Sequence, residues 1–447
     1  MDDNQNIEAI VSNEINSLDS RRFLLAFSGG IDSMVLLDLL INLVKETDQL
    51  RVVHINHNLN EYSDDWAHFS SKVCEKYDLT LINASVKPKR QGKGLEAEAR
   101  ALRYQSFREI IQDNEYLLTG HHQDDQMETL LYRILRGTGI GGLRAIRRKT
   151  KFGKGFLYRP MLNVSRDKIE EYAHLKNLKW IFDSSNDDSN YDRNFLRKDV
   201  IPLIKKRWPS VEKKVSRLAV IAEQNQSLLN EFAIEDIGKL KNYNHLDIDT
   251  LSGKSYPRIV NIFRFMINKN NMGVPSMRVL NEGIKTLMHS KSESPSMTWN
   301  DYSIRRYKHR LYFLNSSLNS PNNLLTEISW DINKTINLGE NLGSIQAQFL
   351  TGDGISLNKC PKSLAIKYRK GGEEIKPSGH KITKSLKNLF QENNVLPWVR
   401  DKIPLIYVDQ ELISVGDLWF NQDYKASSNE DGFLITWDKK IDVIHNS

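Results

Sequence analysis

Short apolar runs alternate with amphipathic stretches in the first part of the chain. The runs Phe23–Phe27, Arg51–Asn56, Leu79–Ser85 and Tyr116–Thr119 are typical of buried strands. Periodic apolar positions between them predict helices, and this alternation is typical of a parallel sheet that is covered by helices. We therefore expect an α/β domain over residues 1–212, with ligands bound beyond the carboxyl ends of its strands.

After residue 210 the pattern changes to helices. A long amphipathic helix is predicted over Val211–Lys239, and further helices around Ile259–Ile267 and Met277–Met288. The Asn- and Ser-rich residues 315–323 indicate a linker, and the short strands and single helix after it indicate an α+β domain. The predicted domains are 1–212 (α/β), 213–318 (mainly helical) and 330–447 (small α+β).

Composition adds a compartment and a class of partner. The 447 residues are 39% hydrophobic, and the net charge of +7 favours a polyanionic partner. No apolar run approaches the roughly 18 residues that span a bilayer, and no signal peptide is visible, so we expect no membrane association. Cys74 and Cys360 are the only cysteines and cannot form a Cys₄ metal site, which favours the cytoplasm.

One polar turn, between the run Phe23–Phe27 and the next predicted helix, carries the strongest chemical signal. Its glycines let backbone N–H groups approach a ligand, and its serines add hydroxyl groups. Because Asp32 would repel phosphate, the turn implies that Asp32 holds Mg²⁺ beside a pyrophosphate. The alternative is an ordinary strand–helix turn that is capped by Asp32. The predicted phosphate-binding residues are Ser28, Gly29, Gly30, Ile31, Asp32 and Ser33.

This turn resembles the PP-loop of the N-type ATP pyrophosphatases. That family cleaves ATP between its α- and β-phosphates and transfers AMP to an oxygen. The resemblance implies a PP-loop ATPase domain with ATP as a substrate. Because the family includes ligases and tRNA-modifying enzymes, the acceptor of AMP must be identified from other residues.

A second polar segment, His121–Thr129, follows the fourth predicted strand. Asp125 and Glu128 are three residues apart on the helix that begins there, so they project together. Two carboxylates beside an anion site need a cation, which Mg²⁺ or a substrate ammonium would supply. The alternative, which we prefer for Asp124, is that the acids complement the helix N-terminus. The predicted buried face of this helix consists of Met127, Leu130, Leu131 and Ile134.

Basic residues provide candidate phosphate ligands. Arg100 lies on a predicted helix over residues 95–104, and Arg197 follows Arg193 by one helical turn. His57 closes the second predicted strand and could bind a nucleotide. Each has an ordinary alternative, namely a solvated charged face for the arginines and a capped loop for His57. A flexible glycine-rich turn leads to residues that suit an RNA backbone or a solvated loop: Arg144, Arg147, Arg148 and Lys149.

In this order the motifs resemble the tRNA(Ile)-lysidine synthetase family. The matching segments are SGGIDS (28–33), HINH (54–57), LEAEARALRY (95–104), HHQDDQMET (121–129), RGTGIGGL (136–143), DSSN (183–186) and RNFLR (193–197). In the last domain, RKGGEE (369–374) and LPWVRDKIPL (396–405) extend the resemblance.

The resemblance implies a ligase that converts the wobble cytidine of a CAU-anticodon tRNA(Ile) to lysidine, so that the tRNA reads AUA. The cytosine C2 oxygen would attack the ATP α-phosphate and release diphosphate, and the ε-amine of L-lysine would then displace AMP. The implied catalytic residues are Asp32, Asp125, Glu128, Arg100 and Arg197, and His57 joins the loop in binding the nucleotide. The implied tRNA contacts are Arg144, Arg147, Arg148, Lys149, Arg369, Lys370, Lys381, Lys384 and Lys387.

Two other functions remain open at this stage. A tRNA cytidine thiolase with the same loop would deliver sulfur, but such enzymes typically need clustered cysteines. A non-enzymatic RNA-binding protein would have no use for three carboxylates in one crevice. The sequence does not assign the base, the metal ligand and the lysine ligand among these carboxylates. It also leaves the oligomeric state open, with a homodimer as one option.

Overall fold

The computed structural model describes residues 6–44, 49–57, 62–88, 95–182, 192–238, 240, 242–315, 327–339 and 342–438. The chain forms two compact units, residues 1–229 and 230–447, and each is described here by itself. The predicted domain boundaries at 212, 318 and 330 remain predictions. The DSSN motif (183–186) and the predicted linker after Asn315 lie outside the described residues.

A sheet forms the centre of the first unit. β1 (Arg22–Ala26) pairs in parallel with β2 (Gln49–Asn56) on one side and with β4 (Tyr116–Leu118) on the other. β3 (Thr80–Ser85) pairs in parallel with β2, and β6 (Gly155–Tyr158) pairs in parallel with β4. The strand order is β3-β2-β1-β4-β6-β5. The predicted α/β class and the four predicted strands are therefore confirmed.

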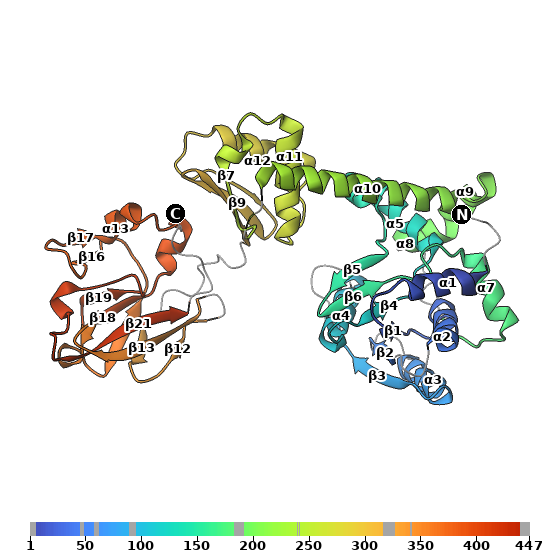
Figure 1. Ribbon diagram of the computed structural model, residues 1–447, viewed down its shortest axis with the longest axis horizontal. Coiled ribbons are helices and arrows are strands. Elements are labelled where there is room, and N and C mark those ends of the chain that lie inside the picture. The colour runs from blue at the N-terminus through green and yellow to red at the C-terminus, as the bar shows by residue number, and fades with distance from the viewer. Residues whose placement is uncertain are drawn as a thin grey trace. The chain divides into compact units, whose positions relative to one another are not determined.

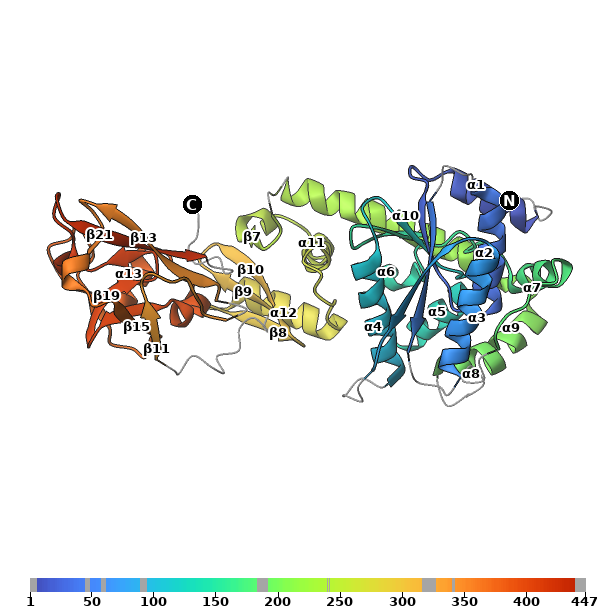
Figure 2. The same ribbon diagram turned by 90° about the horizontal axis from the view of Figure 1, so that it is seen from below.

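Both faces of this sheet are buried. Phe23 and Leu25 of β1 belong to one hydrophobic core and Leu24 belongs to another, because successive residues of a strand face opposite sides. Continuous apolar strands of this kind are typical of parallel sheets. The helices that pack on the first face are α1 (Ile7–Asn16), α2 (Ile31–Leu43), α3 (Ser63–Lys76) and α7 (Arg166–Leu175), and α4 (Leu95–Ile110) packs on the second (Figure 2).

The hairpin at the edge of the sheet was not predicted. β5 (Lys149–Phe152) turns at Gly153 and pairs antiparallel with β6, where the sequence predicts part of a basic loop. Within β5 only Phe152 is buried, and the remaining side chains face outward or are partly exposed. A lysine-rich edge strand of this kind lacks the apolar alternation from which strands are recognised. The glycine-rich turn before it also contains a short helix, α6 (Ile140–Leu143).

Helix α5 (Gln123–Leu135) begins after β4, as predicted, but its predicted buried face is partly wrong. Met127 and Leu130 are 1% and 2% exposed, whereas Ile134 is 47% exposed. Glu128 is only 4% exposed. The last turn of the helix therefore lies outside the core, and a carboxylate is buried near its start.

The chain continues through α8 (Asp192–Phe195), a π-helical turn (Leu196–Val200) and α9 (Ile201–Arg207). The predicted long helix is α10, which begins at Val211 and ends at Ile237. No helix among the described residues combines the length and the hydrophobicity that crossing a membrane requires.

In the second unit, α11 (Tyr256–Lys269) and α12 (Met277–His289) pack on an antiparallel sheet. Phe263 of α11 and Leu287 of α12 are fully buried in this core. Two helices cover this sheet, as the predicted helical character of the region requires, but the sheet itself was not part of the prediction. Its strands, in spatial order, are β7 (His245–Asp247), β10 (Arg310–Asn315), β9 (Tyr302–Tyr307) and β8 (Ser296–Trp299).

The C-terminal part of this unit has two larger antiparallel sheets around one core that contains Trp330 and Phe433 (Figure 1). The first has the order β11 (Ile328–Asp331), β15 (Ser363–Lys367), β18 (Leu405–Val408), β19 (Glu411–Val415) and β20 (Trp419–Phe420). The second has the order β12 (Ile336–Asn337), β13 (Ser344–Thr351), β21 (Asp431–Asp438) and β14 (Ile355–Ser356). With α13 (Leu386–Glu392) and the small pair β16 (Glu374–Ile375) and β17 (Lys384–Ser385), the predicted α+β class is confirmed.

Candidate active site

The turn Ser28–Ser33 lies at the carboxyl end of β1, where α2 begins. Gly29 has a φ of +81°, which glycine adopts without strain. The Ser33 hydroxyl donates to the Gly30 carbonyl over 2.9 Å and lies 3.2 Å from the Ser28 hydroxyl, so it is already used in shaping the turn. No described side chain caps α2 at Gly30. Backbone N–H groups at an uncapped helix start favour an anion.

Two other segments hold this turn closely. A Cβ atom on Gly120 would lie 3.1 Å from the carbonyl group of Asp32, so any larger residue where the chain leaves β4 would press on the backbone of the turn. The Ile181 N–H donates to the Gly29 carbonyl over 2.9 Å. Neither contact could be predicted, because sequence spacing does not show which distant segments meet.

The three predicted acids come together at the carboxyl edge of the sheet. Nε2 of His122 lies 3.7 Å from Oδ1 of Asp32 and 3.5 Å from Oδ2 of Asp125. Nη2 of Arg197 lies 3.1 Å from Oδ1 of Asp125 and 2.7 Å from Oε2 of Glu128. A histidine and an arginine therefore connect all three carboxylates into one charged cluster.

The start of α5 fixes two of these groups. His122 is the N-cap residue: its Nδ1 accepts a bond from the Asp124 N–H over 3.3 Å, and Asp125 accepts one from the His122 N–H over 2.9 Å. This capping box satisfies two N–H groups that the helix itself leaves unpaired. Asp124 instead pairs with Nζ of Lys205 at 2.6 Å, which agrees with the structural part expected for it.

The three carboxyl groups differ in acidity. Burial raises the pKa of Asp32 and of Glu128, and the neighbouring cations only partly oppose it. Burial would also raise the pKa of Asp125. The combined effect of His122, His121 and Arg197 is larger, so the pKa of Asp125 is lowered. Asp125 therefore holds its negative charge most firmly, and Glu128 is the better proton acceptor of the pair.

Arg166 belongs to this cluster and was missed in the sequence. Its Nη1 donates to Oδ1 of Asp32 over 2.7 Å, and its Nε donates to Glu170 over 2.7 Å. Among the described residues, no hydrogen bond or ion pair involves Oδ2 of Asp32. No local pattern could identify Arg166, because it lies at the start of α7, far along the chain from Asp32.

The two arginines of the RNFLR segment, predicted to bind phosphate, have carboxylates as their partners in the structure. Arg197 binds Asp125 and Glu128, and Nη1 of Arg193 lies 3.7 Å from Oε1 of Glu128. The guanidinium of Arg193 also lies over the Tyr132 ring, 5.4 Å from its centre. Because Arg197 sits in the π-helical turn after α8, this irregular segment positions it at the acids. A phosphate contact of either arginine remains a prediction.

Two partly buried imidazoles at strand ends, those of His121 and His57, are neutral. Burial lowers the pKa of His121 to about 3, although Asp125 acts against it, and the His121 Nδ1 lies 2.9 Å from the Thr119 hydroxyl. Burial, reinforced by Arg103, lowers the pKa of His57 to about 4. Nδ1 of His57 is buried without a hydrogen bond. Both rings are therefore uncharged at neutral pH.

The predicted tRNA contacts of the first unit are not brought together. Arg144 pairs with Glu223 at 3.4 Å, and Arg148 forms an ion pair with Glu14. Lys149 donates to the Tyr116 hydroxyl over 2.7 Å. Only Arg147 is exposed without an acidic partner among the described residues.

The second unit carries the other predicted tRNA contacts. Arg369 is 3.3 Å from Asp401, and Lys384 is 2.7 Å from Glu392. Lys370, Lys381 and Lys387 have exposed side chains. A tRNA contact of these five residues remains a prediction.

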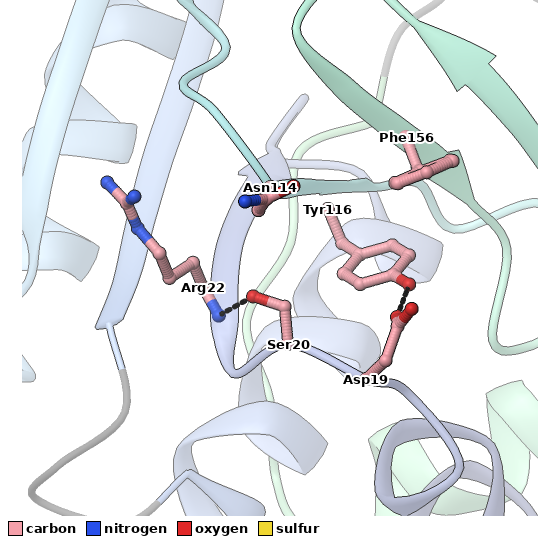
Figure 3. Close-up of a pocket in the computed structure, with 6 residues that line it drawn as sticks. All are labelled: Asp19, Ser20, Arg22, Asn114, Tyr116 and Phe156. Atoms are coloured by element: carbon pink, nitrogen blue, oxygen red, sulfur yellow. Dashed lines mark hydrogen bonds between the residues drawn. The ribbon is translucent and has the colours of Figure 1, made fainter.

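A pocket of about 330 Å³ lies at the opposite edge of the sheet (Figure 3). Its lining residues include Arg22, where β1 begins, and Tyr116, where β4 begins, so it is at the amino ends of the strands. The Tyr116 hydroxyl donates to the Asp19 carboxylate in this pocket. Ligands of open α/β sheets bind at the carboxyl ends, which favours the charged cluster over this pocket as the candidate reaction site.

Comparison with known proteins gives matches along most of the chain. Residues 2–204 match the PP-loop domain, residues 246–312 the TilS substrate binding domain, and residues 364–437 the TilS substrate C-terminal domain. The tRNA(Ile)-lysidine synthase of Coxiella burnetii (strain RSA 493 / Nine Mile phase I) is 35% identical over 420 residues, which cover 92% of each chain. That of Legionella pneumophila (strain Paris) is 36% identical over 416 residues, which cover 90% of this chain and 93% of the relative.

Among solved structures, the U34-tRNA thiolase NcsA from Methanococcus maripaludis covers 48% of this chain and 78% of its own. The TM-score is 0.40 and the identity is 16%, and a likeness of this size carries no inference.

Acidification should destabilise the first unit through His57. Its pKa is about 4 in the folded protein and 6.5 ordinarily, so between these values the unfolded chain binds a proton that the folded chain does not. Stability should therefore fall as the pH is lowered from about 6.5 to about 4. We expect His57→Asn to flatten this fall in thermal unfolding followed by circular dichroism. The exposed His68→Asn should follow the wild type, and equal slopes for all three proteins would contradict the assignment.

Proposed function

The chain belongs to the tRNA(Ile)-lysidine synthase family, and we propose that it joins L-lysine to C2 of the wobble cytidine, position 34, of a CAU-anticodon tRNA(Ile). ATP is consumed, AMP and diphosphate are released, and the intermediate is an adenylated cytidine. The modified tRNA then reads AUA as isoleucine. The observation that carries the proposal is the meeting of Asp32, Asp125 and Glu128 beside the PP-loop.

The PP-loop would hold the diphosphate portion of ATP. Backbone N–H groups of Ser28–Ser33 and the start of α2 provide the donors, and they are aimed at a developing negative charge. Asp32 suits a magnesium ion, because Mg²⁺ is commonly held by one or two carboxylates together with phosphate oxygens, and Oδ2 of Asp32 is open. When bound, Mg²⁺ would neutralise the charge of the leaving diphosphate. The described residues contain no cluster of three metal-ligating side chains, and this arrangement needs none.

Asp125 and Glu128 would hold the lysine ε-amine. They already bind one cation, because the Arg197 guanidinium contacts both. The side chain of Arg197 is half exposed, so an ammonium group of the same charge can replace its contacts from solvent. Asp125, with its lowered pKa, would orient the amine, and Glu128, with its raised pKa, would accept the proton before the amine attacks C2.

The structure favours neither of the other two functions. Burial raises the pKa of the Cys74 and Cys360 thiols to about 11, and the two cysteines belong to different units. A thiolase needs thiolates close to its acceptor, and these thiols are protonated at neutral pH. A protein that only bound RNA would lose affinity from the acidic cluster, because carboxylates repel phosphates.

The remaining proposals concern the partner surface and the compartment. Lys370, Lys381 and Lys387 would contact the tRNA backbone through shape and charge, as exposed lysines suit phosphates. The enzyme would act in the cytoplasm, where tRNA, ATP and free lysine are found.

The proposed reaction is tested by mass analysis of the wobble nucleoside after incubation with ATP, isotope-labelled lysine and a CAU-anticodon tRNA(Ile). We expect the label to enter the nucleoside, and AMP to form in equal amount. Omission of lysine should prevent the labelled product. A thiolated cytidine formed with sulfide, or an unmodified nucleoside under all conditions, would contradict the proposal.

Asp32→Asn should lower the rate of adenylation by about 100-fold or more, because it removes the charge that would hold Mg²⁺ beside the diphosphate. The rate is measured as release of diphosphate in the presence of the tRNA. Asp113→Asn, an exposed acid of the same unit, is the control and should behave as the wild type. Adenylation by Asp32→Asn at the wild-type rate would refute the role of Asp32.

Glu128→Gln should chiefly impair the second step. The KM for lysine should rise by about tenfold or more, the usual cost of losing one charge-assisted contact, while adenylation changes little. The two steps are measured separately as lysine incorporation and diphosphate release. Asp124→Asn, on the same turn of α5 but paired with Lys205, should leave the KM for lysine unchanged. An unaltered KM in Glu128→Gln would contradict the lysine site.

A further inference from the structure

Three arginines lie together near the active site without an acidic partner. They are Arg100 of α4, Arg147 before β5 and Arg159 after β6, here called the arginine triad. The Arg159 side chain donates to the Arg147 carbonyl, and the charges of Arg100 and Arg147 both lower the pKa of Arg159. Within the described parts of the chain, none of the three forms an ion pair. This contrasts with Arg144, Arg148, Arg166 and Arg197, which all pair with acids.

Arg159 is a buried arginine for which the described residues provide no acidic partner. It is only 8% exposed, and its Nε is buried with no hydrogen-bond partner. Its Nη1 donates to the Arg147 carbonyl over 2.5 Å, so it also fixes the backbone that carries Arg147. A buried guanidinium with an unused donor is costly unless a ligand completes it.

The surroundings of the triad do not supply negative charge. Burial lowers the pKa of Arg159; Tyr104 partly opposes this effect, and the like charges of Arg100 and Arg147 add to it. The nearby His121 is neutral, and the Tyr104 ring lies 5.2 Å from the Arg100 guanidinium. Three guanidinium groups that no protein acid balances make a site for an anion with several oxygens.

The triad is separate from the place proposed for the diphosphate. The charged groups that act most on Asp32 are His122, Arg166, Asp125 and Arg197, and none of them belongs to the triad. The uncapped helix start and the backbone of the PP-loop already provide for the ATP phosphates. Arg147 is exposed, so a long polymer can reach the triad from solvent.

We propose that the arginine triad binds a phosphodiester group of the substrate RNA next to the wobble nucleotide, with Arg159 as a positioning residue that holds Arg147. This inference rests on the proposed function. Arg148 and Lys149 already have partners within the protein, and the proposed phosphodiester site does not require them. By fixing the backbone beside the target nucleotide, the triad would aim the base at the carboxylates.

The test is a binding cycle with the full chain and a CAU anticodon stem–loop RNA, in which one phosphodiester at a time is replaced by an uncharged methylphosphonate. Arg147→Gln should weaken binding of the unmodified RNA by about tenfold, and should reduce the slope of log K against log salt by about 0.7. With the methylphosphonate at the contacted linkage beside nucleotide 34, the same substitution should cost nothing further. Because Arg147 is exposed, its variant should fold normally.

Arg159→Lys and Arg108→Gln complete the series. Arg159→Lys keeps the charge but loses the bond to the Arg147 carbonyl, so we expect weaker binding of the unmodified RNA only. Arg108→Gln removes one exposed charge from the same helix as Arg100 and should bind as the wild type. Equal losses from Arg147→Gln at every modified linkage, or a higher KM for ATP with unchanged RNA affinity, would overturn the inference.

These outcomes are distinct from those that test the reaction. RNA binding is measured without ATP or lysine. If the effect of Arg147→Gln on RNA affinity disappears with one particular methylphosphonate, the result supports the triad even if no lysidine forms. If lysidine forms but Arg147→Gln weakens RNA binding equally at every modified linkage, the phosphodiester site is refuted and the proposed reaction still stands.

Discussion

Three carboxylates can stay charged in a small, partly buried space only if cations balance them, and the candidate active site is built around this constraint. Asp32 is balanced by Arg166, and Asp125 and Glu128 share Arg197. Like charges at this separation in a medium of low polarity would otherwise drive at least one group to take up a proton. The balancing cations come from α7 and the π-helical turn, so the site exists only when these distant segments have packed on the sheet.

Much of the first unit could be predicted because its signals are local. The strand beginning at Phe23 in the prediction begins at Arg22 in the structure, and the predicted turn Ser28–Ser33 joins β1 to α2. Prediction failed where tertiary packing overrides the local pattern. The β5–β6 hairpin has exposed lysines on its edge strand, and Ile134 belongs to an apolar series that extends past the core.

The candidate site divides in the same way. Asp32, Asp125 and Glu128 could be proposed as neighbours because strand ends converge at one edge of a parallel sheet. Their partners could not, since Arg166 meets Asp32 only through the folding of α7 onto α2. Arg197 shows a further limit, because an arginine pattern that suits phosphate oxygens suits carboxylates equally well. Sequence spacing indicates that an anion is bound there, but not which one.

The dipeptide His121-His122 lies where the acidic and the basic parts of the site meet, and this arrangement bears on the reaction. His122 contacts Asp32 and Asp125, and the neutral His121 lies near Asp125 as well as near Arg159 and Arg100. An acidic half beside a basic half suits a substrate whose phosphates are anionic, whose nucleophile is cationic, and whose reacting base is neutral. A site for phosphates alone would gain nothing from Asp125 and Glu128, because carboxylates that hold no metal ion oppose the binding of phosphate. Asp125 and Glu128 become useful when a cationic amine must be bound and deprotonated next to a nucleic acid, which is the step proposed for lysine.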